Sequence, residues 1–258
     1  MLAKRLEPAA LGHPNAMKAL ADATGGRGIT AALDALKFQR QTLIAFRQTI
    51  QTEKEMISSI QSASEASARS QTEILDAAMG SDLPVAILER ARQDLMALTN
   101  PGKADAKLLA ALRTVLSSEV SANERYQSYM SALAGARYDF PERSNPYTAK
   151  ASELIVDLFS RNLASGAPEG SEITRMKTVQ AALKAAALAE RSIALMQIGL
   201  PLIDAYQDEK RRRGALDFDD LIARTRVLLT QSNAAEWVLY KLDGGLSHLL
   251  LDEAQDTS

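Results

Sequence analysis

The sequence contains no cysteine and only two histidines among its 258 residues. Without cysteine there can be no disulfide bonds and no thiolate metal sites, and this absence is typical of a reducing cytoplasm. The two histidines, His13 and His248, are too few for a histidine-based zinc site. The sequence also has no run of 18 apolar residues and no signal-peptide pattern, so it predicts neither a membrane span nor export. We therefore expect a cytoplasmic protein with no membrane partner.

The sequence also has no excess of positive charge, since it contains 30 basic and 32 acidic side chains. A compact nucleic-acid-binding protein usually shows a basic excess, so composition alone does not indicate DNA binding, and any DNA contact must come from a local patch. Aromatic residues make up only 5% of the chain, whereas apolar residues make up 46% and charged residues 24%. This balance indicates a globular protein, and its alanine and leucine content favours helices.

The longest stretch without glycine or proline covers residues 29–79, and it predicts one long helix or two helices with a hidden break. Leu36, Leu43, Ile50 and Ile57 recur every seven residues, as in the seam of a coiled coil. We favour packing of this seam within the same chain, as a hairpin arm or bundle helix. The alternative is a docking surface for a partner.

Turn residues divide the remainder into further predicted helices. Ser81 or Asp82 can cap the helix that has Pro84 in its first turn, and Gly199 with Pro201 predicts a kink or break in the longest helix. The predicted helices cover residues 84–98, 104–133, 145–163, 171–213, 217–231 and 234–242.

Two basic segments are candidates for contact with DNA. Arg137 and Arg143 flank aromatic residues in a predicted loop, a mixture that can clamp single-stranded nucleic acid. The alternative is that the aromatic residues anchor the loop to the core. The second segment, Lys210, Arg211, Arg212 and Arg213, ends a predicted helix before a glycine, where cations favour the helix dipole. We prefer this structural interpretation, and a patch that contacts phosphates is the alternative.

The chain ends with an apolar run followed at once by two carboxylates, Asp252 and Glu253. An all-apolar run suits a buried parallel strand, and carboxylates at its carboxyl end point into the crevice where open α/β sheets bind ligands. This layout is used to hold Mg²⁺ beside a nucleotide phosphate and to orient a water molecule. A solvated strand end is the alternative, but the pattern Asp-Glu-x-Gln-Asp is far more specific than two acids alone.

A second acidic cluster, Asp217, Asp219 and Asp220, begins the predicted helix over residues 217–231. Taken alone, three carboxylates could indicate a metal site. Capping by Asp217, with the other two acids in the positive first turn, is the commoner arrangement. We therefore predict a capped helix at this position.

These motifs together resemble the superfamily 1 DNA helicases of the UvrD/RecB type. That family has a glycine and Asp-Phe-Asp-Asp-Leu shortly before Asp-Glu-x-Gln-Asp, as residues 214–221 and 252–256 have here. Residues 237–245, Trp-Val-Leu-Tyr-Lys-Leu-Asp-Gly-Gly, are similar to AddA, a helicase-nuclease subunit, in its alphaproteobacterial form. The resemblance covers residues 206–258. Residues 1–205 are compatible with the family's helical insert but carry no motif.

The resemblance implies ATP and Mg²⁺ as cofactors, and DNA and an AddB-like second subunit as partners, in the repair of double-strand breaks by recombination. By the same resemblance, Asp252 holds Mg²⁺ through a water, and Glu253 is the general base. Gln255 senses the γ-phosphate, and Asp256 braces the turn.

The sequence contains no Gly-x-x-x-x-Gly-Lys-Ser/Thr loop to hold phosphates. We therefore expect an internal fragment without ATPase activity of its own. Residues 1–213 would be the helical insert, and residues 214–258 a slice of the RecA-like core. The expected fold is mainly α, a bundle of five to seven long helices followed by this truncated α/β slice, with one strand near Leu249. The alternative function is a helical DNA- or partner-binding scaffold without catalysis.

Overall fold

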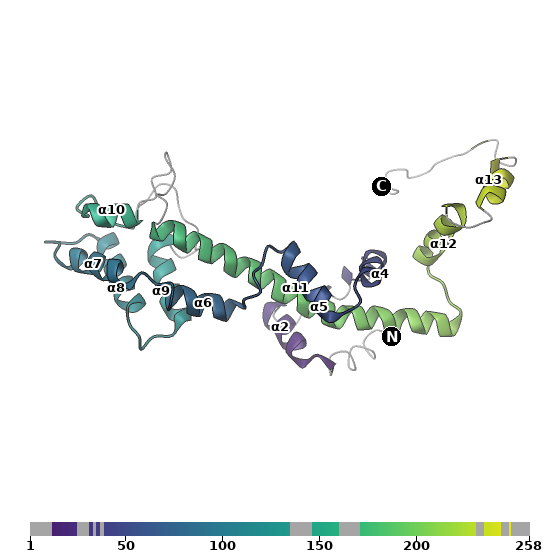
Figure 1. Ribbon diagram of the computed structural model, residues 1–258, viewed down its shortest axis with the longest axis horizontal. Coiled ribbons are helices and arrows are strands. Elements are labelled where there is room, and N and C mark those ends of the chain that lie inside the picture. Colours follow the sequence, from purple (N-terminus) through teal and green to yellow (C-terminus); the bar gives the residue numbers. More distant parts are fainter. Residues whose placement is uncertain are drawn as a thin grey trace. The chain divides into compact units, whose positions relative to one another are not determined.

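The computed structural model describes residues 12–24, 31–32, 35–36, 39–134, 146–159, 171–230, 235–243 and 248. This part of the chain is helical and contains no β-strand, which confirms the mainly α fold (Figure 1). The described residues form eleven helices, and all except α11 are short, so the prediction of five to seven long helices is wrong. The predicted strand near Leu249 lies outside the described residues. The helices within them are α2 (Pro14–Thr24), α4 (Arg40–Thr49), α5 (Glu53–Ala63), α6 (Gln71–Met79), α7 (Val85–Met96), α8 (Lys103–Val115), α9 (Ala122–Ala134), α10 (Glu153–Phe159), α11 (Glu172–Arg213), α12 (Phe218–Thr230) and α13 (Ala235–Asp243).

The chain divides into two compact units. Unit 1 comprises Met1–Pro14, Arg27–Thr49 and Gln197–Ser258, and unit 2 comprises Asn15–Gly26 and Ile50–Met196. Helix α11 contributes to both, because the division falls inside it. The predicted boundary between residues 213 and 214 concerns the insert and the ATPase core, and it stays a prediction.

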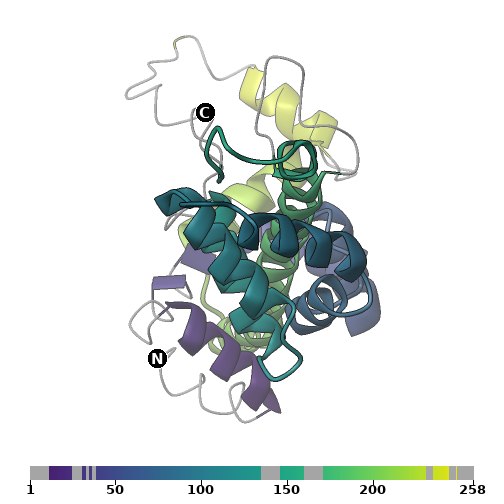
Figure 2. The ribbon, with the colours of Figure 1, turned by 90° about the vertical axis from the view of Figure 1, so that its left-hand side faces the viewer.

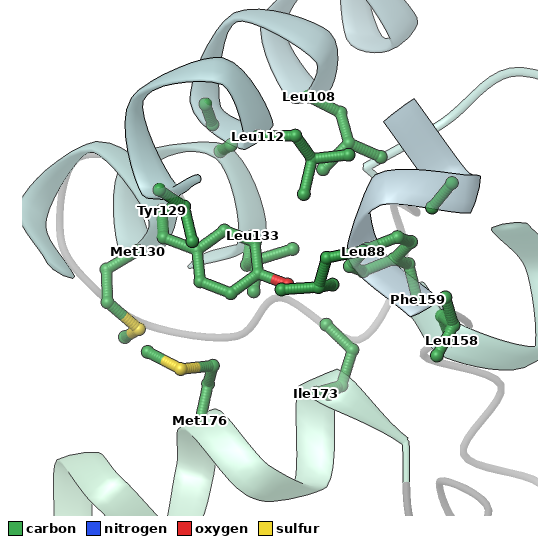
Figure 3. Close-up of a cluster of buried hydrophobic side chains, with 14 of the residues drawn as sticks. Leu88, Leu108, Leu112, Tyr129, Met130, Leu133, Leu158, Phe159, Ile173 and Met176 are labelled. Carbon is green, nitrogen blue, oxygen red and sulfur yellow. The ribbon is translucent and has the colours of Figure 1, made fainter. Parts of the chain in front are cut away.

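Unit 2 has a continuous hydrophobic core. Helices α7, α8 and α9 supply most of it, and α8 packs against both of the others, among the teal helices of Figure 2. On α8, the buried residues Leu108, Ala111, Leu112 and Val115 are spaced three and four apart, so one face of the helix is apolar. In Figure 3, Ile173 and Met176 of α11 point toward the same core. Its largest fully buried side chains include Leu88, Leu108, Leu112, Tyr129, Met130, Leu133, Phe159, Ile173 and Met176.

One buried polar network joins α9 and α11 inside this core. The hydroxyl of Tyr129 donates to Glu172 Oε2 at 2.8 Å, and Arg175 donates to both carboxylate oxygens of Glu172 at 2.7 and 2.9 Å. Arg175 Nη1 also donates to the Ala78 carbonyl at 2.9 Å. Burial, together with the neighbouring Glu172 charge, raises the pKa of Tyr129 well above its usual value. The buried carboxylate is therefore both paired and hydrogen-bonded, as burial of a charge requires.

The glycine-free region contains more helix breaks than predicted. Its described part forms α4, α5 and α6, because Thr52 and Ser70 each begin a new helix with a capping box. Ser121 and Glu124 make the same reciprocal bonds at the start of α9, so the single helix predicted over residues 104–133 is wrong. Pro84 precedes α7 without a side-chain cap, so the predicted caps at residues 81 and 82 are also wrong. The helix predicted to start at residue 145 starts only at Glu153, as α10, because residues 146–152 are not helical.

The predicted seam is buried over its first three members, Leu36, Leu43 and Ile50. Ile57 is only half-buried, and the neighbouring Met56 is buried instead. The helix break at Thr52 explains this change, since a new helix need not keep the phase of the old one.

Helix α11 runs unbroken for 42 residues, so the alternative of a break at residues 199–201 is wrong, and the alternative of a kink there stays a prediction. Among the described residues, it alone is long and apolar enough to cross a membrane, by length and composition. Burial of Ile173 and Met176 in the core of unit 2 accounts for part of this apolar character.

Candidate functional site

Most of the predicted site residues lie outside the described part of the chain, and one group lies within it. The residues outside are Asp252, Glu253, Gln255, Asp256, Arg137 and Arg143. The basic run of residues 210–213 ends α11, and Asp217 follows it at the start of α12. The site that the structure describes is therefore the α11–α12 junction, which consists of Arg40, Tyr206, Lys210, Asp217, Asp219 and Asp220.

A glycine ends α11 in the way its sequence predicts. Gly214 has a φ of +61°, in the left-handed region that side chains disfavour. Its N–H donates to the Arg211 carbonyl at 3.2 Å, and the N–H of Ala215 donates to the Lys210 carbonyl at 3.0 Å. This pair of bonds is a Schellman motif, which satisfies two of the last carbonyls of the helix. The motif turns the chain from α11 toward α12.

Each side chain of the basic run has an acidic partner. Lys210 is buried, whereas the side chains of Arg211, Arg212 and Arg213 are 78%, 67% and 58% exposed. Lys210 thus has a structural role at the junction, and the three arginines lie on the surface beside acids of the same helix. The pairs are Lys210 with Asp217 and Asp220, Arg211 with Asp208, and Arg212 and Arg213 with Glu209.

Asp217 is the centre of the junction and accepts hydrogen bonds from three helices. Arg40 of α4 donates to its Oδ1 at 2.7 Å, and Lys210 of α11 donates to its Oδ2 at 3.0 Å. The hydroxyl of Tyr206 also donates to Oδ2, at 3.3 Å. In α12, the N–H of Asp220 donates to Asp217 Oδ1 at 3.0 Å. One carboxylate therefore fixes the start of α12 to α11 and α4.

The environment of Asp217 favours its charged form. Partial burial raises the pKa of the carboxyl, but the hydrogen bond from Lys210, the backbone bond from Asp220 and the charge of Arg40 together lower it to about 2. Lys210 responds in the opposite direction, because Asp220 and Asp217 raise its pKa against the effect of burial. Both shifts favour the charged forms of Asp217 and Lys210 near neutral pH, so this ion pair persists there.

The three carboxylates of this cluster serve as caps and ion-pair partners. Asp217 and Asp220 exchange reciprocal bonds, since the N–H of Asp217 also donates to Asp220 Oδ2 at 3.1 Å. Arg40 pairs with Asp219 as well as with Asp217. Within the described residues, no group of three acidic or histidine side chains is arranged to hold a metal ion. The capping prediction is confirmed.

Two junction residues, Arg40 and Tyr206, were not predicted from the sequence. Arg40 lies 177 positions before Asp217, and no local pattern connects the two. The reciprocal caps of α12 could be predicted from the sequence. Asp217 and Asp220 have the spacing of a capping box, with an aspartate in place of the usual serine or threonine. The sequence therefore predicts the contacts within α12 but not the contact between Arg40 of α4 and Asp217.

Helices α12 and α13 bury none of their residues. The exposed fractions of Phe218, Tyr240, Ile222 and Trp237 are 83%, 76%, 68% and 64%. Most of the exposed large apolar side chains in the described part of the chain lie between Leu216 and Leu242. This segment directly precedes the apolar run and the acids Asp252 and Glu253 in the sequence.

Comparison with known proteins places this arrangement in a family. The model of the UvrD/REP helicase N-terminal domain matches residues 29–258, which include both the junction and the terminal acidic motif. No curated protein and no solved structure matches the chain. Because the match extends over most of its length, the chain belongs to the UvrD/REP helicase family of ATP-dependent DNA helicases.

Proposed function

We propose that Asp252 and Glu253 are the nucleotide-hydrolysis residues of an ATP-dependent DNA helicase. The observation that supports this most is the pattern Asp-Glu-Ala-Gln-Asp, which follows an apolar run directly and ends the region matched by the family model. Helicases of this family use ATP with Mg²⁺, so a carboxylate pair for the metal and the attacking water is what the reaction needs.

Each of the four polar residues of the motif has its own role in this proposal. Asp252 would hold Mg²⁺, which would supply charge neutralisation at the phosphates when bound. Glu253 accepts a proton from the water that attacks the γ-phosphate and orients that water. Gln255 senses the γ-phosphate, and Asp256 braces the turn.

The longer protein to which this segment corresponds is, in our proposal, an AddA-type helicase-nuclease subunit. The stretch Trp237–Gly245 supports this assignment, because it is similar to AddA in its alphaproteobacterial form. The proposal includes a role in double-strand-break repair in the cytoplasm and an AddB-like partner. DNA binding follows from the family, and Arg211, Arg212 and Arg213 are proposed contacts together with Arg137 and Arg143.

We expect no ATP turnover from the 258-residue chain alone, because its sequence has no phosphate-binding loop. In a longer protein that joins this segment to such a loop, Glu253→Gln should lower the rate of ATP hydrolysis at least about a hundredfold, while ATP binding persists. Steady-state phosphate release and nucleotide binding by fluorescence measure the two effects.

Glu236→Gln is a matched control for this test, because Glu236 is an exposed glutamate of α13 that lies outside the motif. It should leave hydrolysis unchanged. Full hydrolysis by the Glu253→Gln protein would disprove the assignment of the general base. Turnover by the 258-residue chain that disappears in Glu253→Gln would disprove its inactivity instead.

A further inference from the structure

We propose that α11 contains a hinge at residues 197–201, about which the two halves of this 42-residue helix bend relative to each other. The inference does not depend on the proposed function. It rests on a proline inside the helix, on the division of the chain into two units at the same turn, and on polar contacts of α11 that lie before and after this turn.

Pro201 weakens the helix at one defined place. Proline has no N–H, so it cannot donate the usual helical bond to the Gln197 carbonyl, and its ring crowds that carbonyl. Pro201 is exposed, so packing against the core does not explain its presence. Bending at a proline is concentrated in the turn between the proline and the residue four before it, which here is the turn from Gln197 to Pro201.

Gly199 lies within the same turn but has a separate explanation. A Cβ atom at this position would lie 2.5 Å from Leu36 Cδ1, so the side chain of Leu36 would have to shift to make room for a larger residue. Glycine nevertheless lowers the helix propensity of the turn, which adds to the effect of Pro201.

The division into units coincides with this turn. The residues of α11 through Met196 belong to unit 2, and those from Gln197 onward belong to unit 1. The connection between Thr49 and Ile50 also crosses from one unit to the other, and there α4 ends before α5 begins at Glu53. Both of these crossings therefore lie at points where helical hydrogen bonding is weakened or interrupted.

Anchoring contacts hold each half of α11 within its own unit. In unit 2, the side chain of Gln71 donates to Glu190 Oε2 at 2.7 Å, and the backbone N–H of Gln71 donates to Oε1 at 3.0 Å. In unit 1, Arg47 pairs with Asp204 at 3.6 Å, and Lys210 pairs with Asp217. The weak turn lies between these polar contacts, so bending there does not break them. Ile198, Leu200 and Leu202 in and beside the turn are buried, so bending must shift their apolar contacts.

The test uses the absence of cysteine, which allows two labels to be attached without background. Lys184→Cys and Asp208→Cys introduce exposed positions on α11 that lie about 36 Å apart along a straight helix. Spin labels at these sites and double electron–electron resonance measure the distribution of distances. We expect a broad distribution in the native chain, and a width that falls by about half when Pro201→Ala restores the helical bond.

Arg191→Ala is the matched control, because Arg191 is exposed on the same helix but lies before the weak turn. It should leave the width unchanged. If the distance distribution had the same width in the native chain and in Pro201→Ala, whether broad or narrow, the proposed hinge would be overturned. A narrowing caused equally by Arg191→Ala would overturn it too.

Amide hydrogen exchange provides a second measurement that needs only the native chain. The amides of residues 198–200 and 202–205 should exchange at least about tenfold faster than those of residues 185–193 in the same helix. Equal protection along both segments would overturn the proposal even if Pro201→Ala failed to fold.

Discussion

Asp217 shows how a single side chain can have both a local and a long-range role in this protein. Its carboxylate caps α12 through the N–H of Asp220 and also accepts bonds from Arg40 and Lys210, which belong to other helices. An asparagine could keep the cap but not the ion pairs. The two roles can therefore be separated by one substitution.

We expect Asp217→Asn to destabilise unit 1 by about 2 kcal/mol at neutral pH, because a pKa of about 2 instead of 3.8 corresponds to a stabilisation of that size. The folded pKa lies below the unfolded one, so this stabilisation is present above about pH 4 and is lost as the pH falls toward 2. Urea unfolding at several pH values, followed by the circular dichroism of the helices, measures it.

Asp219→Asn is the control for this substitution. The Asp219 side chain is 45% exposed and pairs only with Arg40 among the ion pairs described, so its removal should cost less than about 1 kcal/mol. If Asp217→Asn left the loss of stability between pH 4 and 2 unchanged, the ion pairs of Asp217 would not be its cause.

At the scale of helices, the sequence predicted the later elements better than the earlier ones. Glycine, proline and a capping acid mark the ends of α11, α12 and α13, and these helices are confirmed within a residue or two. In residues 29–79 the heptad pattern concealed two breaks, although Thr52 and Ser70 each precede a glutamate by three residues. These two capping boxes were the sequence signals from which the helix breaks could have been predicted.

The contacts that build the junction could be predicted only in part. The Schellman turn at Gly214 and the cap at Asp217 are local, and local patterns in the sequence specify them. The bond between Arg40 and Asp217 joins residues that are 177 positions apart, so it depends on tertiary packing. The roles of Asp252 and Glu253 rest on motif and family alone, since both lie outside the described residues.

We expect Ser70→Ala to destabilise unit 2 by about 1 kcal/mol. The substitution removes the acceptor for the Glu73 N–H and leaves the Glu73 side chain without the hydroxyl that donates to it at 2.9 Å. Thermal unfolding followed by circular dichroism measures the change. Ser58→Ala, at an exposed position inside α5, is the control and should have no effect or stabilise slightly, because alanine is the better helix former. Equal stability of the two variants would show that the box at Ser70 does not stabilise α6.

At the scale of the whole molecule, the two units differ in how they bury apolar surface. Unit 2 has a core of leucine, methionine and aromatic side chains from six helices, α6 to α11. Helices α12 and α13 of unit 1 bury none of their residues, and the junction holds only the start of α12. Full burial of an aromatic or branched apolar side chain stabilises by roughly 1.5–3 kcal/mol, which α12 and α13 do not gain here. We therefore expect α12 and α13 to be locally less stable than the core helices of unit 2.

We therefore expect amide hydrogen exchange in α12 and α13 to be at least about a hundredfold faster than in α8 and α9 of the same sample. Local opening of α12 and α13 exposes little additional apolar surface, whereas opening of α8 and α9 exposes residues such as Leu108 and Leu133, which are fully buried. Mass spectrometry of the exchanged peptides, at two protein concentrations about tenfold apart, measures the difference. Rates that are equal across these helices and independent of concentration would show that α12 and α13 are stabilised within the chain itself, contrary to their exposure. Protection of α12 and α13 that rises with concentration would instead show that Phe218, Ile222, Trp237 and Tyr240 become covered by a second copy.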